Sequence, residues 1–192
     1  MAADVLSIQG AVLPDHEIRR RAILTPFVDY DQCPKGVVSY GLSSCGYDIR
    51  LAEAVFVSGL SVDGHDVKAP PPHLERLPVL HGRIWIPPRS RALGESVERF
   101  DTPPNVVGLS TGKSSYCRQG LIVNVSPQEP GWRGVLTIAL VNPTDLPIAV
   151  YPNEGITQIV FACLTARPER VYGEKGNAKY QDAATVDTGR VA

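Results

Sequence analysis

The sequence predicts a mainly β protein, a distorted β-barrel or jelly roll, on three observations. Most segments are short runs rich in β-branched residues that end at turn residues. Seventeen glycines and seventeen prolines are spread along the 192 residues. Long runs with helical periodicity are scarce. A chain of this length suits one domain with a real core, so we expect a barrel domain with an N-terminal helix over 1–172 and a tail over 173–192.

One helix is expected near the start, in the segment "LPDHEIRRRAI". Pro14 and Asp15 can begin it, and Ile18 and Ala22 follow Asp15 at helical spacing. The strands expected after it are 47–57, 82–88, 105–115, 120–126, 134–142, 146–152 and 155–164.

Two segments lack a core pattern. Residues 63–78 contain three consecutive prolines and are expected to form a stiff surface loop. The tail 173–192 is either a frayed terminus or a mobile segment that closes on a ligand.

Composition excludes several classes of protein. Hydrophobic residues make up 43% and charged residues 20%, as in soluble globular chains. A net charge of -1 gives no global basic field for nucleic acid or a membrane surface, so any polyanion must meet clustered cations. The N-terminus has no signal-peptide pattern and no run is long enough to span a bilayer. We therefore expect a cytoplasmic protein with no nucleic-acid or membrane partner.

Metal and disulfide chemistry is not indicated by the cysteines and histidines. No two cysteines form a C-x-x-C pair, which argues against a zinc site or a disulfide framework and for reduced thiols. The H-x-E plus P-C-x-x-C pattern of zinc deaminases is absent. The cysteines are Cys33, Cys45, Cys117 and Cys163, and the histidines are His16, His65, His73 and His81.

The densest polar cluster lies in "GKSSYCRQGL" (112–121). Ser114 and Ser115 supply hydroxyls there, while Lys113 and Arg118 supply positive charge. Phosphate oxygens favour such a set of donors. The spacing is not that of a P-loop, and a solvated basic turn is the favoured interpretation at this point.

Two carboxylates stand out beside turns. Asp48 lies between Tyr47 and Arg50, which suggests a turn aspartate or a surface pair with Arg50. Glu129 precedes a Pro-Gly turn and an aromatic residue. It is either an ordinary turn glutamate or a carboxylate that accepts from a sugar hydroxyl or orients a water.

Read in order, five motifs resemble the dCTP deaminase family, which shares its fold with the trimeric dUTPases. The first is similar to the family's N-terminal helix, the second to its S-x-D-x-R-L segment, and the third to its phosphate-binding block with the W-x-G turn. The fourth is similar to a late strand with a G-x-x-[AI]-Q pattern, and the fifth to the K-Y motif of a C-terminal lid. They are "LPDHEIRRRAI", "SSCGYDIRLAEAVFV", "GKSSYCRQGLIVNVSPQEPGWRG", "YPNEGITQIVF" and "AKYQ".

The resemblance implies a dUTPase-like barrel assembled as a homotrimer, with three active sites at subunit interfaces. It implies hydrolytic deamination of dCTP to dUTP and ammonia, with dTTP as a possible feedback inhibitor. The expected cofactor is Mg²⁺ held mainly by the triphosphate, with no direct protein ligand and no zinc. Ser114 and Arg118 match the polar pair that assists catalysis, and Glu129 matches the position that contacts the deoxyribose. The nucleotide-binding positions are Lys113, Ser114, Ser115, Tyr116, Cys117, Arg118, Glu129, Thr137, Ile138, Tyr172 and Lys179.

One departure from the family pattern concerns the general acid–base. In the family, a strand glutamate after the W-x-G turn takes the proton of the attacking water, which is work worth about 10²–10⁴-fold in rate. The aligned segment here is "TIALVN", and the position is Ala139. A methyl group cannot carry protons, so the chain is expected to bind nucleotide and deaminate poorly. Either the alanine was introduced to trap substrate, or the lineage lost deaminase activity. The place of a lid glutamine is likewise taken by Ala183.

Two other functions stay open at this stage. In a dUTP diphosphatase, alone or combined with deamination, Glu129 would orient water toward the α-phosphate while Mg²⁺ neutralises charge. A non-catalytic dNTP-binding regulator or structural trimer would bind nucleotide without turnover, even with glutamate at position 139. Ammonia release from dCTP and pyrophosphate release from dUTP separate these alternatives.

Overall fold

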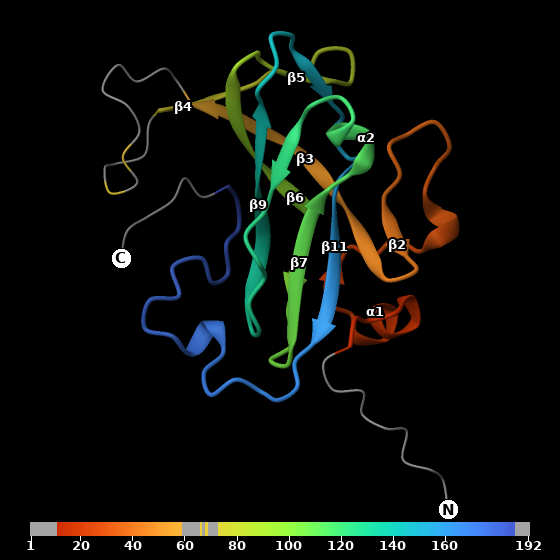
Figure 1. Cartoon of the computed structure of the whole chain (residues 1–192), viewed down its shortest axis with the longest axis vertical. Coiled ribbons are helices and arrows are strands. Elements are labelled where there is room, and N and C mark those ends of the chain that lie inside the picture. Colours follow the sequence, from red (N-terminus) through yellow and green to blue (C-terminus); the bar gives the residue numbers. More distant parts are fainter. Residues whose placement is uncertain (1–10, 59–65, 67, 69–72, 187–192) are drawn as a thin grey trace, which may run out of the picture.

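The structure is a computed structural model that describes residues 11–58, 66, 68 and 73–186. Predictions for the first ten residues, for most of 63–72 and for the last six residues of the tail lie outside this part. Figure 1 shows the whole chain.

Strands dominate the described chain, and helices are short. The elements are α1 (Asp15–Arg21), β1 (Leu24–Thr25), η1 (Tyr30–Gln32), β2 (Gly41–Ser43), β3 (Gly46–Ser58), β4 (Leu74–Arg76), β5 (Ile84–Ile86), β6 (Ser90–Asp101), β7 (Val106–Gly112), α2 (Ser114–Cys117), β8 (Ile122–Asn124), β9 (Arg133–Asn142), β10 (Ile148–Val150), β11 (Gly155–Cys163) and η2 (Tyr172–Glu174).

The main sheet is antiparallel and almost closes on itself. Its strands follow the order β7-β11-β3-β6-β9-β8, so β7 and β8 form its two ends. Gly108 of β7 and Gln128, which follows β8, exchange two backbone hydrogen bonds of 3.1 and 2.9 Å. These two bonds join the ends of the sheet, so fewer backbone groups are left unpaired at its edges. The mainly β, barrel-like fold predicted from the sequence is confirmed (Figure 1).

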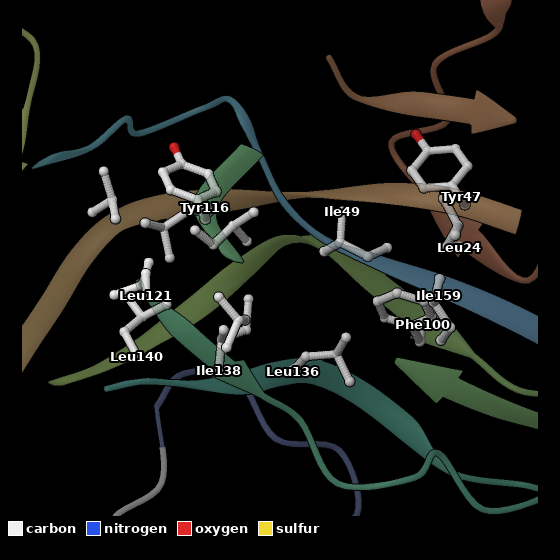
Figure 2. Packing of buried hydrophobic residues seen from close by; sticks show 14 of the residues in the cluster. Leu24, Tyr47, Ile49, Phe100, Tyr116, Leu121, Leu136, Ile138, Leu140 and Ile159 are labelled. Carbon is white, nitrogen blue, oxygen red and sulfur yellow. The ribbon is translucent and has the colours of Figure 1, made fainter. Parts of the chain in front are cut away.

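The core forms where the strands turn alternate side chains inward, as the two-residue strand period requires. On β9, Leu136, Ile138 and Leu140 are at most 4% exposed. Figure 2 shows them beneath Ile49 of β3. Each expected strand overlaps an observed one, and the expected helical segment contains α1, whose Ile18 is fully buried.

The strand β6 was not predicted from the sequence, although it pairs with both β3 and β9 at the centre of the sheet. Its buried positions are occupied mostly by small or polar residues, so no apolar alternation is visible in the sequence. These residues are Ala92, Gly94, Ser96, Glu98 and Phe100. A further correction concerns 63–78, which was expected to be loop throughout. Its end contains the short strand β4, which pairs with β3.

The polar residues inside β6 are held by hydrogen bonds at a bulge. The hydroxyl of Ser96 donates to the carbonyl of Glu98 (2.6 Å) and accepts from the amide of Leu136 (2.8 Å). The Glu98 carboxylate pairs with the guanidinium of Arg50 (2.7 Å) and accepts from its amide (2.9 Å). The register of the β6–β9 pair shifts at the same place, between Glu95 and Arg99. These groups satisfy backbone atoms that the shifted register leaves without strand partners.

Candidate functional site

A cavity of about 580 Å³ lies against the outer face of β9. Its walls come from three parts of the chain: β9 with Trp132 just before it, residues 124–129 from the end of β8 onward, and the C-terminal segment 172–183. This volume is in the range of small-molecule sites. In Figure 1 the C-terminal segment, in blue, runs beside the lower end of β9.

The β9 wall follows from strand alternation. Since Leu136, Ile138 and Leu140 point into the core, the intervening residues Thr137 and Ala139 face the cavity. Ala139 pairs across the sheet with Leu93 of β6 and Asn124 of β8. The polar side chain next to the methyl group is therefore the amide of Asn124, which also lines the cavity.

Backbone and indole hydrogen bonds hold the C-terminal segment over the cavity. The Trp132 indole donates to the carbonyl of Tyr180 (2.8 Å), and the amide of Tyr172 donates to the carbonyl of Pro130 (2.8 Å). The amide of Val135 on β9 donates to the carbonyl of Ala183 (2.9 Å). Residues 172–183 therefore form a cover whose position depends on the Trp132 turn.

Glu129 is the only carboxylate among the residues found to line the cavity in the described chain. It forms an ion pair with Lys175 of the cover, and both side chains are partly exposed. The Lys175 ammonium also lies 5.7 Å from the centre of the Tyr172 ring. Asn177, Lys179 and Tyr180 complete the polar lining of the cover.

The predicted phosphate-binding turn is not part of this cavity. In one chain α2 lies at the upper right of Figure 1, apart from the C-terminal segment at the lower left. Ser114, Ser115, Cys117 and Arg118 are exposed there. Lys113 points elsewhere, because its ammonium contacts Asp48 (2.5 Å) and the hydroxyl of Ser39 (3.1 Å).

The structure also separates two residues of the predicted set from solvent. Tyr116 is 4% exposed, and its hydroxyl accepts from the amide of Tyr151 (3.4 Å). Burial raises the pKa of the Tyr116 phenol to about 12. Ile138 is fully buried in the core. Figure 2 shows the side chains of Tyr116 and Ile138 among the buried hydrophobic residues.

Of the predicted site residues, the single chain therefore brings together Glu129, Thr137, Ala139, Tyr172 and Lys179. Sequence reasoning missed several residues of the same cavity, namely Asn124, Trp132, Lys175, Asn177 and Tyr180. The register of β8 on β9 could have pointed to Asn124, but a register is not readable from two short apolar runs. For Lys175 the available signal was its positive charge, which is opposite to that of Glu129.

The part of the chain that the structure describes shows neither a metal cluster nor a membrane-spanning helix. No group of three or more histidine, cysteine, aspartate or glutamate side chains comes together there to hold a metal ion. None of the described helices has the length and apolar character to cross a bilayer.

Comparison with known proteins gives a consistent result. Residues 12–164 match the family described as dCTP deaminase-like. A dCTP deaminase of Gemmatimonas aurantiaca is 43% identical over 176 residues, which cover 90% of this chain and 93% of that protein. A dCTP deaminase of Acidiphilium cryptum is 42% identical over 185 residues, covering 94% of this chain and 99% of that protein.

Among solved structures, the 2'-deoxycytidine 5'-triphosphate deaminase of Agrobacterium tumefaciens matches with a TM-score of 0.61 and 18% identity. The match covers 81% of this chain and about half, 49%, of that one. At this identity the structural match supports the fold, while the family follows from the sequence matches. The chain belongs to the dCTP deaminase-like family.

Proposed function

We propose that the cavity on β9 binds a pyrimidine deoxynucleotide and that the chain is of dCTP deaminase type, with little deaminase activity because of Ala139. The observation that carries this proposal is the shared cavity of Glu129, Thr137, Ala139, Tyr172 and Lys179. Similarity to dCTP deaminases over most of the chain supports the nucleotide class.

Each wall of the cavity has a role in this proposal. Glu129 accepts from a hydroxyl of the deoxyribose, and the face of Thr137 and Ala139 lies along the base. Tyr172 and Lys179 close over the sugar and phosphates from the cover. Deamination at C4 needs a group that takes a proton from water and returns protons to the ring nitrogen and the leaving ammonia. The side chain at position 139 is a methyl group, which does neither.

The exposed turn around Ser114 and Arg118 lies outside the cavity of its own chain, and this supports a site completed by a second copy. A homotrimer would bring the turn of one chain to the cavity of its neighbour, where Arg118 would meet the phosphates. Within the described residues the cavity offers one carboxylate, already paired with Lys175. This set does not fit a magnesium site made by the protein, so Mg²⁺ enters the proposal only as a companion of the triphosphate.

The test replaces Ala139 by glutamate. The side chain at 139 faces the cavity, so a carboxylate there reaches the base, and ammonia release from dCTP is expected to rise by about 10²–10⁴-fold. Ala139→Gln is the matched control, since it has similar size and no basic oxygen, and it should remain at the low level. Release is measured in a coupled ammonia assay with dCTP and in a pyrophosphate assay with dUTP.

The same experiment separates the remaining functions. No ammonia from the Ala139→Glu chain, with pyrophosphate released from dUTP by the unaltered chain, would identify a dUTP diphosphatase. Tight dNTP binding with neither product would identify a non-catalytic regulator. Inhibition of the Ala139→Glu chain by dTTP would show that dTTP acts as a feedback inhibitor.

A further inference from the structure

The contact between Glu129 and Lys175 has a consequence for ligand binding. Glu129 is the carboxylate proposed to receive a sugar hydroxyl, and its Oε2 accepts a hydrogen bond from the Lys175 ammonium. The Tyr172 ring faces the same ammonium at 5.7 Å. Lys175 thus lies between two residues that line the nucleotide cavity.

Further contacts outside the cavity also hold the C-terminal segment. The carboxylate of Asp182 bridges Arg99 (3.3 Å) and Arg133 (3.1 Å). The carboxylate of Glu95 accepts from the Thr185 hydroxyl and the Val186 amide, both at 2.8 Å. None of the residues in these contacts is found among those lining the cavity. A ligand in the cavity therefore meets the Lys175 contact and leaves the outer contacts in place.

We propose that Lys175 is a ligand-displaced competitor for Glu129 and thereby sets how strongly the site selects a sugar hydroxyl. This inference rests on the proposed function. In the empty site, Lys175 neutralises Glu129 and holds the cover closed. A bound deoxynucleotide exchanges its 3'-hydroxyl for the ammonium at the carboxylate, and the freed ammonium turns toward the anionic phosphates. The hydroxyl then adds little net affinity, since it replaces a charged partner.

The ligand chemistry selected in this way is specific. A ligand with phosphates and no hydroxyl leaves the Glu129–Lys175 pair intact. A ligand with a hydroxyl and no phosphates separates the pair and offers Lys175 no new partner. A deoxynucleotide has both groups, so displacement is compensated only for this class.

The test compares dCTP with 2',3'-dideoxy-CTP, which carries the same phosphates and lacks the hydroxyl. Affinities are measured by calorimetry on the full chain with Lys175→Met and Lys175→Arg. The unaltered chain and Lys175→Arg are expected to prefer dCTP by less than about threefold. Lys175→Met leaves the carboxylate without its competitor, so the preference should rise at least about fivefold, within the range of hydrogen bonds to charged groups. In Lys175→Met neither ligand has an ammonium to displace or to contact, so the ratio of the two affinities reports the bond between Glu129 and the hydroxyl.

Asp182→Asn is the control for a merely loosened cover. It weakens the outer contacts and should speed amide exchange over 180–186 while leaving the ratio unchanged. A ratio that is the same in Lys175→Met and the unaltered chain overturns the inference while leaving the proposed function standing. Failure of every form to bind either nucleotide overturns both.

Discussion

Single residues determine what the cavity of this chain can do chemically. A methyl group stands at position 139 on a strand face whose neighbouring cavity residues, Val135 and Thr137, are also uncharged. The amide of Asn124 lies opposite it across the strand pair and both donates and accepts hydrogen bonds. An amide at this place can orient a base, whereas proton transfer needs a group with an accessible pKa. Binding and turnover therefore depend on different side chains of one small surface.

A second pair of residues, Arg50 and Glu98, concerns stability. The Glu98 carboxylate is fully buried on β6, and Arg50 is its charged partner, with its guanidinium 5.0 Å from the Tyr40 ring centre. Burial raises the pKa of Glu98 above its usual 4.5, although Arg50 acts in the opposite direction. The folded chain thus holds the Glu98 proton more tightly than the unfolded chain does.

This pKa shift predicts a loss of stability with rising pH. From about pH 4.5 upward to the folded pKa of Glu98, the folded state binds more protons than the unfolded state, so the free energy of unfolding falls as pH rises. Glu98→Gln should remove this decline and lower stability overall by about 3–5 kcal/mol, because Arg50 keeps its buried charge without a partner. Urea unfolding of both chains between pH 4 and 8 measures the effect.

The control for this prediction is Asp29→Asn. Asp29 is paired with Arg19, and the pKa of its carboxyl is lowered to about 2, chiefly by the hydrogen bonds from Arg19. Its contribution is complete above the usual pKa of 3.8 and is lost only as pH falls toward 2. The Asp29→Asn chain should therefore keep the decline above pH 4.5, and an equal decline in Glu98→Gln contradicts the assignment.

At the scale of elements, the turn before β9 connects the barrel to the cover. Gly131 has φ +77°, and a Cβ at this position would lie 2.8 Å from the Cβ of Val171, where the cover begins. The amide of Tyr172 and the indole of Trp132 bond across the same turn. The close approach of the Val171 side chain to the Gly131 backbone requires glycine here, both for the positive φ and for the space.

A substitution at this turn separates the effect of backbone strain at a positive φ from the effect of the contact with Val171. Gly131→Ala should destabilise the fold and speed amide exchange of 172–183, because the added methyl pushes Val171 away. Gly36→Ala is the matched control, since Gly36 has φ +83° and a Cβ at this position would meet no atom within 4 Å. It should cost only the backbone penalty of about 1–2 kcal/mol, with no change in the cover. Equal exchange rates over 172–183 in the two variants would refute a role for the Gly131–Val171 contact.

At the scale of the whole molecule, each chain holds two halves of the proposed site at separate places. The cavity lies under the C-terminal cover, and the Ser114–Arg118 turn is exposed beyond it (Figure 1). The two ends of the main sheet also expose large apolar side chains, with Leu109 on β7 at 53% and Ile122 on β8 at 54%. Both features favour assembly of several copies, which buries apolar surface and brings one chain's turn to another chain's cavity.

Assembly predicts recovery of activity between inactive chains. Light scattering should give about 62 kDa, three times the chain mass of 20.8 kDa. In the Ala139→Glu background, chains with Arg118→Ala and chains with Glu129→Gln should each be weak. After mixing and co-refolding, ammonia release should recover in part, since some interfaces then join an intact turn to an intact cavity. A monomer in solution, or a mixture no more active than its parts, argues against a shared site.

The sequence by itself was enough for the fold class, because strand alternation and turn residues are local properties. It also predicted the helix at 15–21 and the β9 segment, where Ala139 was singled out from "TIALVN" before any register was known. It could not predict β6, whose inward residues are mostly small or polar and become a strand only through pairing with β3 and β9.

The tertiary structure alone decided which predicted residues meet. Ile138 and Tyr116 lie within the predicted motifs and yet point into the core, because alternation and helix phase turn them inward. Asn124 and Lys175 were not among the predicted site residues and yet lie in the cavity, since sheet register and the path of the cover bring them there. Such contacts join residues as far apart as Glu129 and Lys175, and only the packed chain defines them.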